Sequence, residues 1–326
     1  MIDNRIIKKL VAVIILIFIT TVIIPSSAQD LKKQSTSIIL GNILYVGGSG
    51  PDNYTKIQDA IDNATDGDTV FVYDDSSPYN DSFSVDKSIT LQGENINTTI
   101  IHGRCSISSN FVIISGFMFQ IWEIPGMNIE GFSNNIIENC IFNRSSGGTW
   151  IEKSDNNIIR NCSFIFCEFT TLQIERSNNI ELSYCDFFNS NDWFFGRASV
   201  VIRSSRGINI NHCNIACNKY GGISAVASFV KMRSNNIFNN DDPAVILKLL
   251  SFCDMRNNWW GGPDGPNVTM YFSDFFEMHW GLGPLRIRKV DNGDSVIYTR
   301  PISLLGFNRI RPWLSDPVVD AGQQFN

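Results

Sequence analysis

The sequence predicts an all-β fold in which the chain winds into a parallel β-helix, because residues of one kind recur about every 22 positions. The column that shows this best is Cys140, Cys162, Cys185, Cys213, Asn235 and Asn257. A second column stands about 11 residues upstream: Ile129, Ile151, Ile174 and Ile202. Its spacings of 22, 23 and 28 equal those of the cysteines, so both columns belong to one repeating unit.

Each unit has room for three short strands. Apolar alternations such as residues 111–114 and 172–174 are typical of short strands. A leucine-rich repeat would need regular Leu and Asn positions, and a helical repeat would need a period of about 3.6 residues; neither is present. Asn pairs such as Asn156 and Asn157 suit the turns, because Asn tolerates left-handed backbone. Stacked units would form rungs about 4.8 Å apart.

The first element is an expected signal peptide over residues 1–28. Three basic residues precede the apolar run 10–24, and small residues up to Ala28 offer a cleavage site. The run is short for a membrane span, and an uncleaved anchor over residues 6–24 is the alternative. We therefore expect a secreted or cell-surface protein.

Three further segments follow the leader. Within residues 29–68, Thr55 and Gln58 have the spacing of a capping box, before a short helix whose apolar face would close the coil. The β-helix is expected over 69–266, where Trp259, Trp260 and a Gly/Pro-rich turn end the repeat. Residues 267–326 have no period and are interpreted as a C-terminal cap. Capping is needed because an open rung exposes unpaired backbone groups.

Charge and cysteine usage exclude some partners. The net charge is −6, and loss of residues 1–28 would make it −8, with no basic stripe for nucleic acid. The stacked cysteines are interpreted as buried thiols, since stacked Cβ atoms would lie about 4.8 Å apart and a disulfide prefers about 3.8 Å. The three histidines share no metal-ligand spacing with the cysteines.

These features resemble the right-handed parallel β-helix, or pectin-lyase-like, superfamily, in particular its secreted microbial surface proteins. The similar segments are residues 54–62 (YTKIQDAID), 67–72 (GDTVFV), 257–266 (NNWWGGPDGP) and 312–317 (PWLSDP). The resemblance implies a right-handed coil, here of about eight turns with an N-terminal capping helix and a C-terminal cap. Because the superfamily includes lyases, hydrolases, epimerases, adhesins and metal-delivery proteins, it does not fix the function.

Candidate ligand-binding residues follow the inward isoleucines, because successive residues of a strand face opposite sides. These outward residues are Glu130, Glu152, Glu175 and Arg203. Stacked glutamates repel one another unless cations offset them, and Lys153 and Arg176 follow two of them. Calcium at the glutamates is the one cofactor considered; otherwise none is expected.

An insertion beside this ladder adds a second candidate feature. About six extra residues bulge from the repeat over residues 188–198, with Trp193 as the ring best suited to stack on a sugar. The alternative is that Trp193 packs the loop onto the coil and that the glutamates form an ordinary solvated face.

Catalysis is the remaining question. Glycosidases need two carboxylates about 5 Å or 6.5–9.5 Å apart, a condition that any stacked acids satisfy. The Asp-rich or Lys/Arg signatures that the superfamily's hydrolases and lyases use are not found. We therefore expect a non-catalytic protein that binds carbohydrate or another surface polymer. The alternatives are a polysaccharide lyase or glycoside hydrolase, and third a metal-delivery protein.

Overall fold

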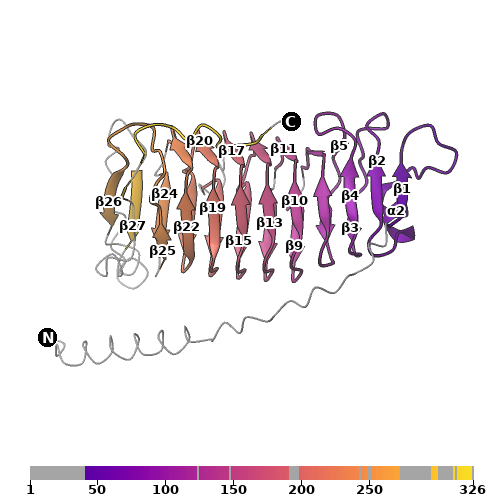
Figure 1. Cartoon of the computed structure of the whole chain (residues 1–326), viewed down its shortest axis with the longest axis horizontal. Coiled ribbons are helices and arrows are strands. Elements are labelled where there is room, and N and C mark those ends of the chain that lie inside the picture. Colours follow the sequence, from indigo (N-terminus) through magenta and orange to yellow (C-terminus); the bar gives the residue numbers. More distant parts are fainter. Residues whose placement is uncertain are drawn as a thin grey trace, which may run out of the picture. The chain divides into compact units, whose positions relative to one another are not determined.

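The computed structural model describes residues 41–122, 125–146, 148–190, 198–241, 244–248, 251–271, 295–299, 311–312 and 314–324. These residues form a parallel β-helix of three sheets, with strands side by side from β1 at one end to β26 and β27 at the other (Figure 1). The expected all-β coil is therefore confirmed. The number of turns, about nine, is close to the expected eight.

Three sheets, here called A, B and C, share the strands in rotation. Sheet A contains β1 (Ile43–Val46), β2 (Thr69–Val72), β4 (Thr90–Gly93), β7 (Ile113–Ser115), β10 (Ile136–Glu138), β13 (Ile158–Arg160), β16 (Glu181–Ser183), β19 (Ile208–Asn211), β22 (Phe229–Arg233) and β25 (Phe252–Asp254). Sheet B contains β5 (Ile100–Ile101), β8 (Met118–Phe119), β11 (Ile141–Asn143), β14 (Ser163–Ile165), β17 (Asp186–Phe188), β20 (Asn214–Ala216) and β23 (Asn236–Phe238). Sheet C contains β3 (Phe83–Val85), β6 (Cys105–Ile107), β9 (Met127–Glu130), β12 (Thr149–Glu152), β15 (Leu172–Glu175), β18 (Val200–Arg203), β21 (Ile223–Val226), β24 (Val245–Lys248), β27 (Ser295–Thr299) and β26 (Asn267–Tyr271).

Both sequence columns stack inside the coil. Ile129, Ile151, Ile174 and Ile202 are register partners on successive strands of sheet C, and all are fully buried. The four column cysteines are also buried, and all eight cysteines are free thiols, of which Cys217 is exposed. One member of the column was predicted wrongly. The buried residue that stacks on Asn235 one rung later is Asn258, whereas Asn257 is exposed at a corner with φ 60°.

A column of stacked rings lies in sheet B and was not predicted. Phe119, Phe142, Phe164 and Phe187 occupy one register position, and their neighbouring ring centroids lie 4.9, 4.5 and 5.0 Å apart. Their planes are within 15° of parallel. The rings fill one side of the core along three rung spacings.

Sharp corners connect the sheets through left-handed residues. Asn134, Asn156 and Asn179 have φ of 62°, 56° and 54°, which agrees with the expectation that asparagine forms the turns. The corner after sheet C uses residues with less natural preference for this conformation: Lys153, Arg176, Ser204 and Ala227.

A buried serine follows that corner on each of five rungs: Ser154, Ser177, Ser205, Ser228 and Ser251. The hydroxyls of the last four accept a hydrogen bond from the backbone N–H of the serine one rung earlier, at 3.1–3.3 Å. Ser154 accepts in the same way from the N–H of Phe132. The ladder satisfies donors that the corner would otherwise bury unpaired.

Helix α2 (Ile57–Asn63) is the one helix of the described residues, and its buried face consists of Ile57, Ala60 and Ile61, as expected. The capping box was wrong. The helix is preceded by Lys56 without a side-chain cap, and the Gln58 amide oxygen instead accepts a hydrogen bond from the Ser84 N–H at 2.7 Å. Gln58 therefore joins the helix to β3.

The described residues after 266, which were expected to form a C-terminal cap, include two further strands of the β-helix. β27 pairs with β24, and β26 pairs with β27, so two strands extend sheet C. Residues 314–324, which include a turn at residues 318–321, run back along the coil, seen as the yellow trace in Figure 1. No helix in the described part of the chain has the length and apolar character needed to cross a bilayer. The expected signal peptide, residues 1–28, lies outside the described residues.

Candidate functional site

The predicted charged ladder is formed at the carboxyl ends of sheet C strands. Glu130, Glu152, Glu175 and Arg203 are register partners in that order, each as the last residue of its strand. The Glu152 and Glu175 side chains are about a quarter exposed, and Glu130 about half. The structure therefore brings these four predicted residues together on one outward face.

Basic side chains at the next corner neutralise the glutamates. Lys153 lies 3.1 Å from Glu130 and 3.4 Å from Glu152. Arg176 pairs with Glu152 and lies 3.4 Å from Glu175, which is 3.9 Å from Arg203. The ladder thus alternates three acids with three bases, and each exposed pair contributes only about 0–1 kcal/mol.

Proton affinities at the ladder follow from this pairing. The hydrogen bond from Arg176 holds the pKa of the Glu152 carboxyl below its ordinary value. The hydrogen bond from Lys153 to Glu130 raises the pKa of the Lys153 ammonium. A carboxyl that is held ionised is a poor general acid, because a general acid must carry its proton near neutral pH.

Metal ligands are not gathered at this face. Among the residues that the structure describes, no three His, Cys, Asp or Glu side chains are placed to hold a metal ion together. The ladder glutamates are oriented toward ammonium and guanidinium groups instead. Trp193, the predicted stacking ring, lies outside the described residues.

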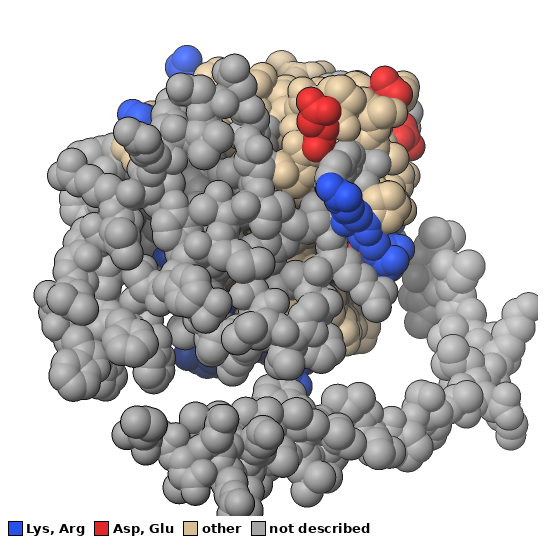
Figure 2. Space-filling view, turned by 90° about the vertical axis from the view of Figure 1, so that its left-hand side faces the viewer, with Lys and Arg blue, Asp and Glu red and all other residues tan. Residues whose placement is uncertain are grey.

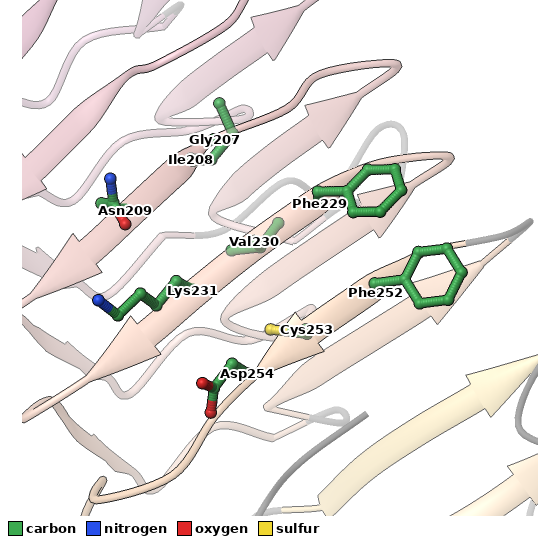
Figure 3. A pocket seen from close by; sticks show the side chains of 9 residues that line it. All are labelled: Gly207, Ile208, Asn209, Phe229, Val230, Lys231, Phe252, Cys253 and Asp254. Atoms are coloured by element: carbon green, nitrogen blue, oxygen red, sulfur yellow. The ribbon is translucent and has the colours of Figure 1, made fainter. Parts of the chain in front are cut away.

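A second feature, on the outer face of sheet A, was not predicted. A shallow hollow of about 250 Å³ lies across β19, β22 and β25, over the following lining residues: Gly207, Ile208, Asn209, Phe229, Val230, Lys231, Phe252, Cys253 and Asp254 (Figure 3). Phe229 and Phe252 stack on one side of it, with ring centroids 4.8 Å apart and planes 25° apart. Asn209, Lys231 and Asp254 form a polar row on successive strands beside the rings.

Gly207 keeps one end of the hollow open. It has φ 66° and occupies, one rung later, the corner position before sheet A that Asn134, Asn156 and Asn179 occupy on earlier rungs. A Cβ at this position would lie 2.6 Å from the Asn179 amide oxygen, so a larger residue would force a shift. Sequence alone could have shown this departure, because a glycine and then two phenylalanines replace the asparagines of the column.

Basic groups outnumber acids around this hollow. Asp254 is paired with both Arg233 and Arg256, whose hydrogen bonds hold the pKa of its carboxyl far below the ordinary value. Lys231 is exposed beside Asp254, and the Arg206 guanidinium lies 5.5 Å from the centre of the Phe229 ring. With Glu181, the register partner of Asn209 on β16, two carboxylates therefore stand near four cations.

The two faces are neighbours along the chain. Arg203, the last member of the ladder, precedes Arg206 by three residues, and Gly207 follows directly. An end-on view of the coil from the β26 side shows the described Lys/Arg and Asp/Glu side chains in separate spots on that face (Figure 2). The charged ladder on sheet C and the hollow on sheet A thus lie on either side of the corner formed by residues 204–207.

Comparisons with known proteins support the fold. Residues 103–260 match the family model described as "Right handed beta helix region", in agreement with the parallel β-helix that the structure shows. No curated protein matches the sequence significantly.

Several solved structures share the architecture at low identity. The enzymatically active domain of tailspike protein 2 from bacteriophage CBA120 is 13% identical over 78% of this chain and 44% of its own, with a TM-score of 0.42. Pectate lyase Pel9A is 12% identical over 70% and 69%, with a TM-score of 0.40. The A-module of the mannuronan C-5 epimerase AlgE4 from Azotobacter vinelandii is 10% identical over 84% and 98%, with a TM-score of 0.33. The chain spans less than half the length of the tailspike domain.

Proposed function

We propose that this chain is an exported β-helix protein that binds an acidic surface polysaccharide without cleaving it. The observation that carries the proposal is the hollow on sheet A, where Phe229 and Phe252 stand beside a polar row with an excess of positive charge. Export rests on the leader expected over residues 1–28, with an anchor over residues 6–24 as the alternative.

The hollow has the chemistry that sugar recognition needs. An aromatic ring face packs against the C–H face of a sugar, while amides and charged groups bind its hydroxyls. Phe229 and Phe252 supply rings, and Asn209 supplies an amide on the neighbouring row. Lys231 would then pair with the carboxylate of a uronic acid unit, because Asp254 is already neutralised by two arginines.

The ladder on sheet C would extend the binding surface. Its groups repeat on successive rungs, about 4.8 Å apart, which suits a linear polymer better than a small molecule. Lys153, Arg176 and Arg203 offer cations to the polymer, and the glutamates accept hydrogen bonds from its hydroxyls. Trp193 remains our predicted stacking ring beside this ladder, and calcium at the glutamates remains a secondary proposal.

The state of two acids argues against general-acid catalysis by these residues. The pKa values of both Glu152 and Asp254 are held low by arginines, so neither is suited to protonate a leaving group. Asp186 has a raised pKa because it is buried, but it hydrogen-bonds to the C-terminal segment, away from the hollow.

The proposal is tested by incubating the protein with immobilised uronate and neutral polysaccharides. We measure retention together with new reducing or unsaturated ends. Retention of the uronate polymers only, without new ends, is expected. Lys231→Gln and Phe252→Ala should each weaken binding about tenfold, equivalent to about 1.4 kcal/mol.

Matched controls lie toward the β1 end of the coil, away from the hollow, the ladder and the 188–198 insertion. Lys56→Gln removes another exposed lysine, and Phe111→Ala removes another exposed ring. Neither should change retention. Equal retention of neutral polymers, or equal losses in the control variants, would contradict the proposed site, and new unsaturated ends would establish a lyase instead.

A further inference from the structure

Four outward side chains hold the C-terminal segment against the coil. Asn161, Asp186, Asn214 and Asn236 stand on successive rungs near the start of sheet B, and are here called the amide row. The segment crosses them in reverse order, so residues 318–324 pass from the rung of Asn236 to that of Asn161 (Figure 1).

The amide row binds the main chain of this segment. Asn236 forms two bonds with Val318, accepting from its N–H at 2.7 Å and donating to its carbonyl at 2.9 Å. Asn161 forms the same pair with the N–H and the carbonyl of Gln324. Between them, Asn214 donates to the Ala321 carbonyl at 3.0 Å, and Asp186 accepts from the Gln323 N–H at 3.1 Å.

Two positions of the segment contribute through more than their backbone hydrogen bonds. Val319 is 99% exposed and Asp320 is exposed, whereas the buried Gln323 side chain donates to the Asn161 carbonyl at 3.0 Å. The other position is 322, which must be glycine. Gly322 has φ 94°, and a Cβ there would lie 2.2 Å from the Asn214 side-chain nitrogen and 2.3 Å from an Asp186 oxygen.

Hydrogen bonds within the row fix its geometry. Asn236 donates to Asn214 at 2.9 Å, and Asn214 donates to Asp186 at 2.9 Å. Asn161, the fourth member, donates to the Asn139 side chain on the preceding rung. Since all four side chains are held in this way, the row loses little conformational freedom when a main chain binds. The spacing of the row follows from the coil itself.

We infer that the amide row is a docking groove for a main chain that turns at residues 318–321 and has glycine at the position of Gly322, and that a second copy of this chain supplies that segment by exchange. Residues 318–324 of another copy would make the same bonds as the chain's own segment. Exchange of an identical element costs little free energy, because every hydrogen bond broken within one copy is formed again between the two copies. The partner is therefore recognised by main-chain bonds, the glycine position and the Gln323 amide, a different chemistry from the proposed polymer site.

The test uses the full chain with Gly322→Ala, which should release the segment and leave the groove open. A fluorescent peptide with the sequence of residues 314–324 should bind this variant at least tenfold more tightly than the native chain, whose groove is occupied. The same peptide with alanine at position 322 should not bind either protein. Fluorescence anisotropy measures both.

Further measurements test whether the segment is released, whether the row binds the peptide, and whether two copies exchange segments. Protease sensitivity of the segment and protection of the buried thiols show whether Gly322→Ala releases the segment while the coil stays folded. A second variant that adds Asn236→Ala to Gly322→Ala should lose peptide binding about tenfold. Two native chains with different fluorophores, warmed together and cooled at high concentration, should form doubly labelled dimers that Gly322→Ala cannot form.

Several results would overturn the inference. One is a segment that stays protease-resistant in Gly322→Ala. Another is an open groove that binds the glycine and alanine peptides equally or binds neither. The absence of doubly labelled dimers from the native mixture would overturn exchange between copies.

Discussion

Replacement of Phe164 by alanine should destabilise the coil strongly. Its ring is fully buried and stacks on two others, with centroids 4.5 Å from Phe142 and 5.0 Å from Phe187 and planes within 5° of parallel. A buried Phe→Ala change costs about 3–5 kcal/mol, and each aromatic pair contributes about 0.5–1.5 kcal/mol beyond area burial. Because both faces of the ring lose a partner, we expect about 4–5 kcal/mol.

Urea unfolding followed by circular dichroism measures this loss. Phe166→Ala is the matched control, because the same side chain two residues away is 52% exposed. It should change the free energy of unfolding by no more than about 0.5 kcal/mol. A loss below about 1.5 kcal/mol for Phe164→Ala, or equal losses in both variants, would refute the view that the ring column holds the rungs together.

Three other predictions concern thiols, pH and the sheet C face. Cysteine alkylation followed by mass mapping should modify Cys217 in the folded protein, while the column thiols should react only after unfolding. The reason is that burial raises the pKa of column members such as Cys162 and Cys213. A disulfide within the column would contradict this prediction. The carboxyl pKa values of Glu152 and Asp254 are lowered in the folded state, so their stabilisation is present above the ordinary carboxyl pKa and is lost as pH falls through the folded-state values. Urea midpoints from pH 7 to pH 3 should therefore fall less steeply in Asp254→Asn than in the native protein. An equal slope in the two proteins would argue against stabilisation by the Asp254 carboxylate. Trp193→Ala should weaken polymer binding with little change in melting temperature, whereas a large loss of stability with unchanged binding would show that the ring packs the loop. Glu152→Gln should change affinity only modestly, and loss of a measurable turnover would instead show catalysis.

The repeat could be predicted from sequence because inward residues are constrained to one kind at one spacing. Ile129 and Ile151 keep their period because each is enclosed by neighbouring rungs, and their register identifies Glu130 and Glu152 as outward partners. The error at Asn257 arose where the spacing changes from 22 to 23, because asparagine occurs at both the corner and the inward position.

Features that depend on contacts between distant segments were beyond sequence reasoning. Gln58 has the spacing of a capping residue, but Ser84, 26 residues away, offers its amide a better partner than the helix end. The hollow depends on a missing side chain at Gly207 beside rings from the next two rungs. Main-chain recognition by Asn236 places no requirement on the side chain of Val318, so sequence reasoning could not pair the two residues.

The serine ladder has a consequence for how such a chain can change its length. Every hydroxyl serves the rung before it, so one whole rung can be removed without stranding a donor of this ladder. Deleting residues 139–160 would bring the Phe132 N–H, now bonded to Ser154, opposite the hydroxyl of Ser177. The amide row begins at Asn161 and would be kept entire. Duplication or loss of single turns is therefore a route by which the coil could grow or shorten during evolution while the serine ladder stays intact.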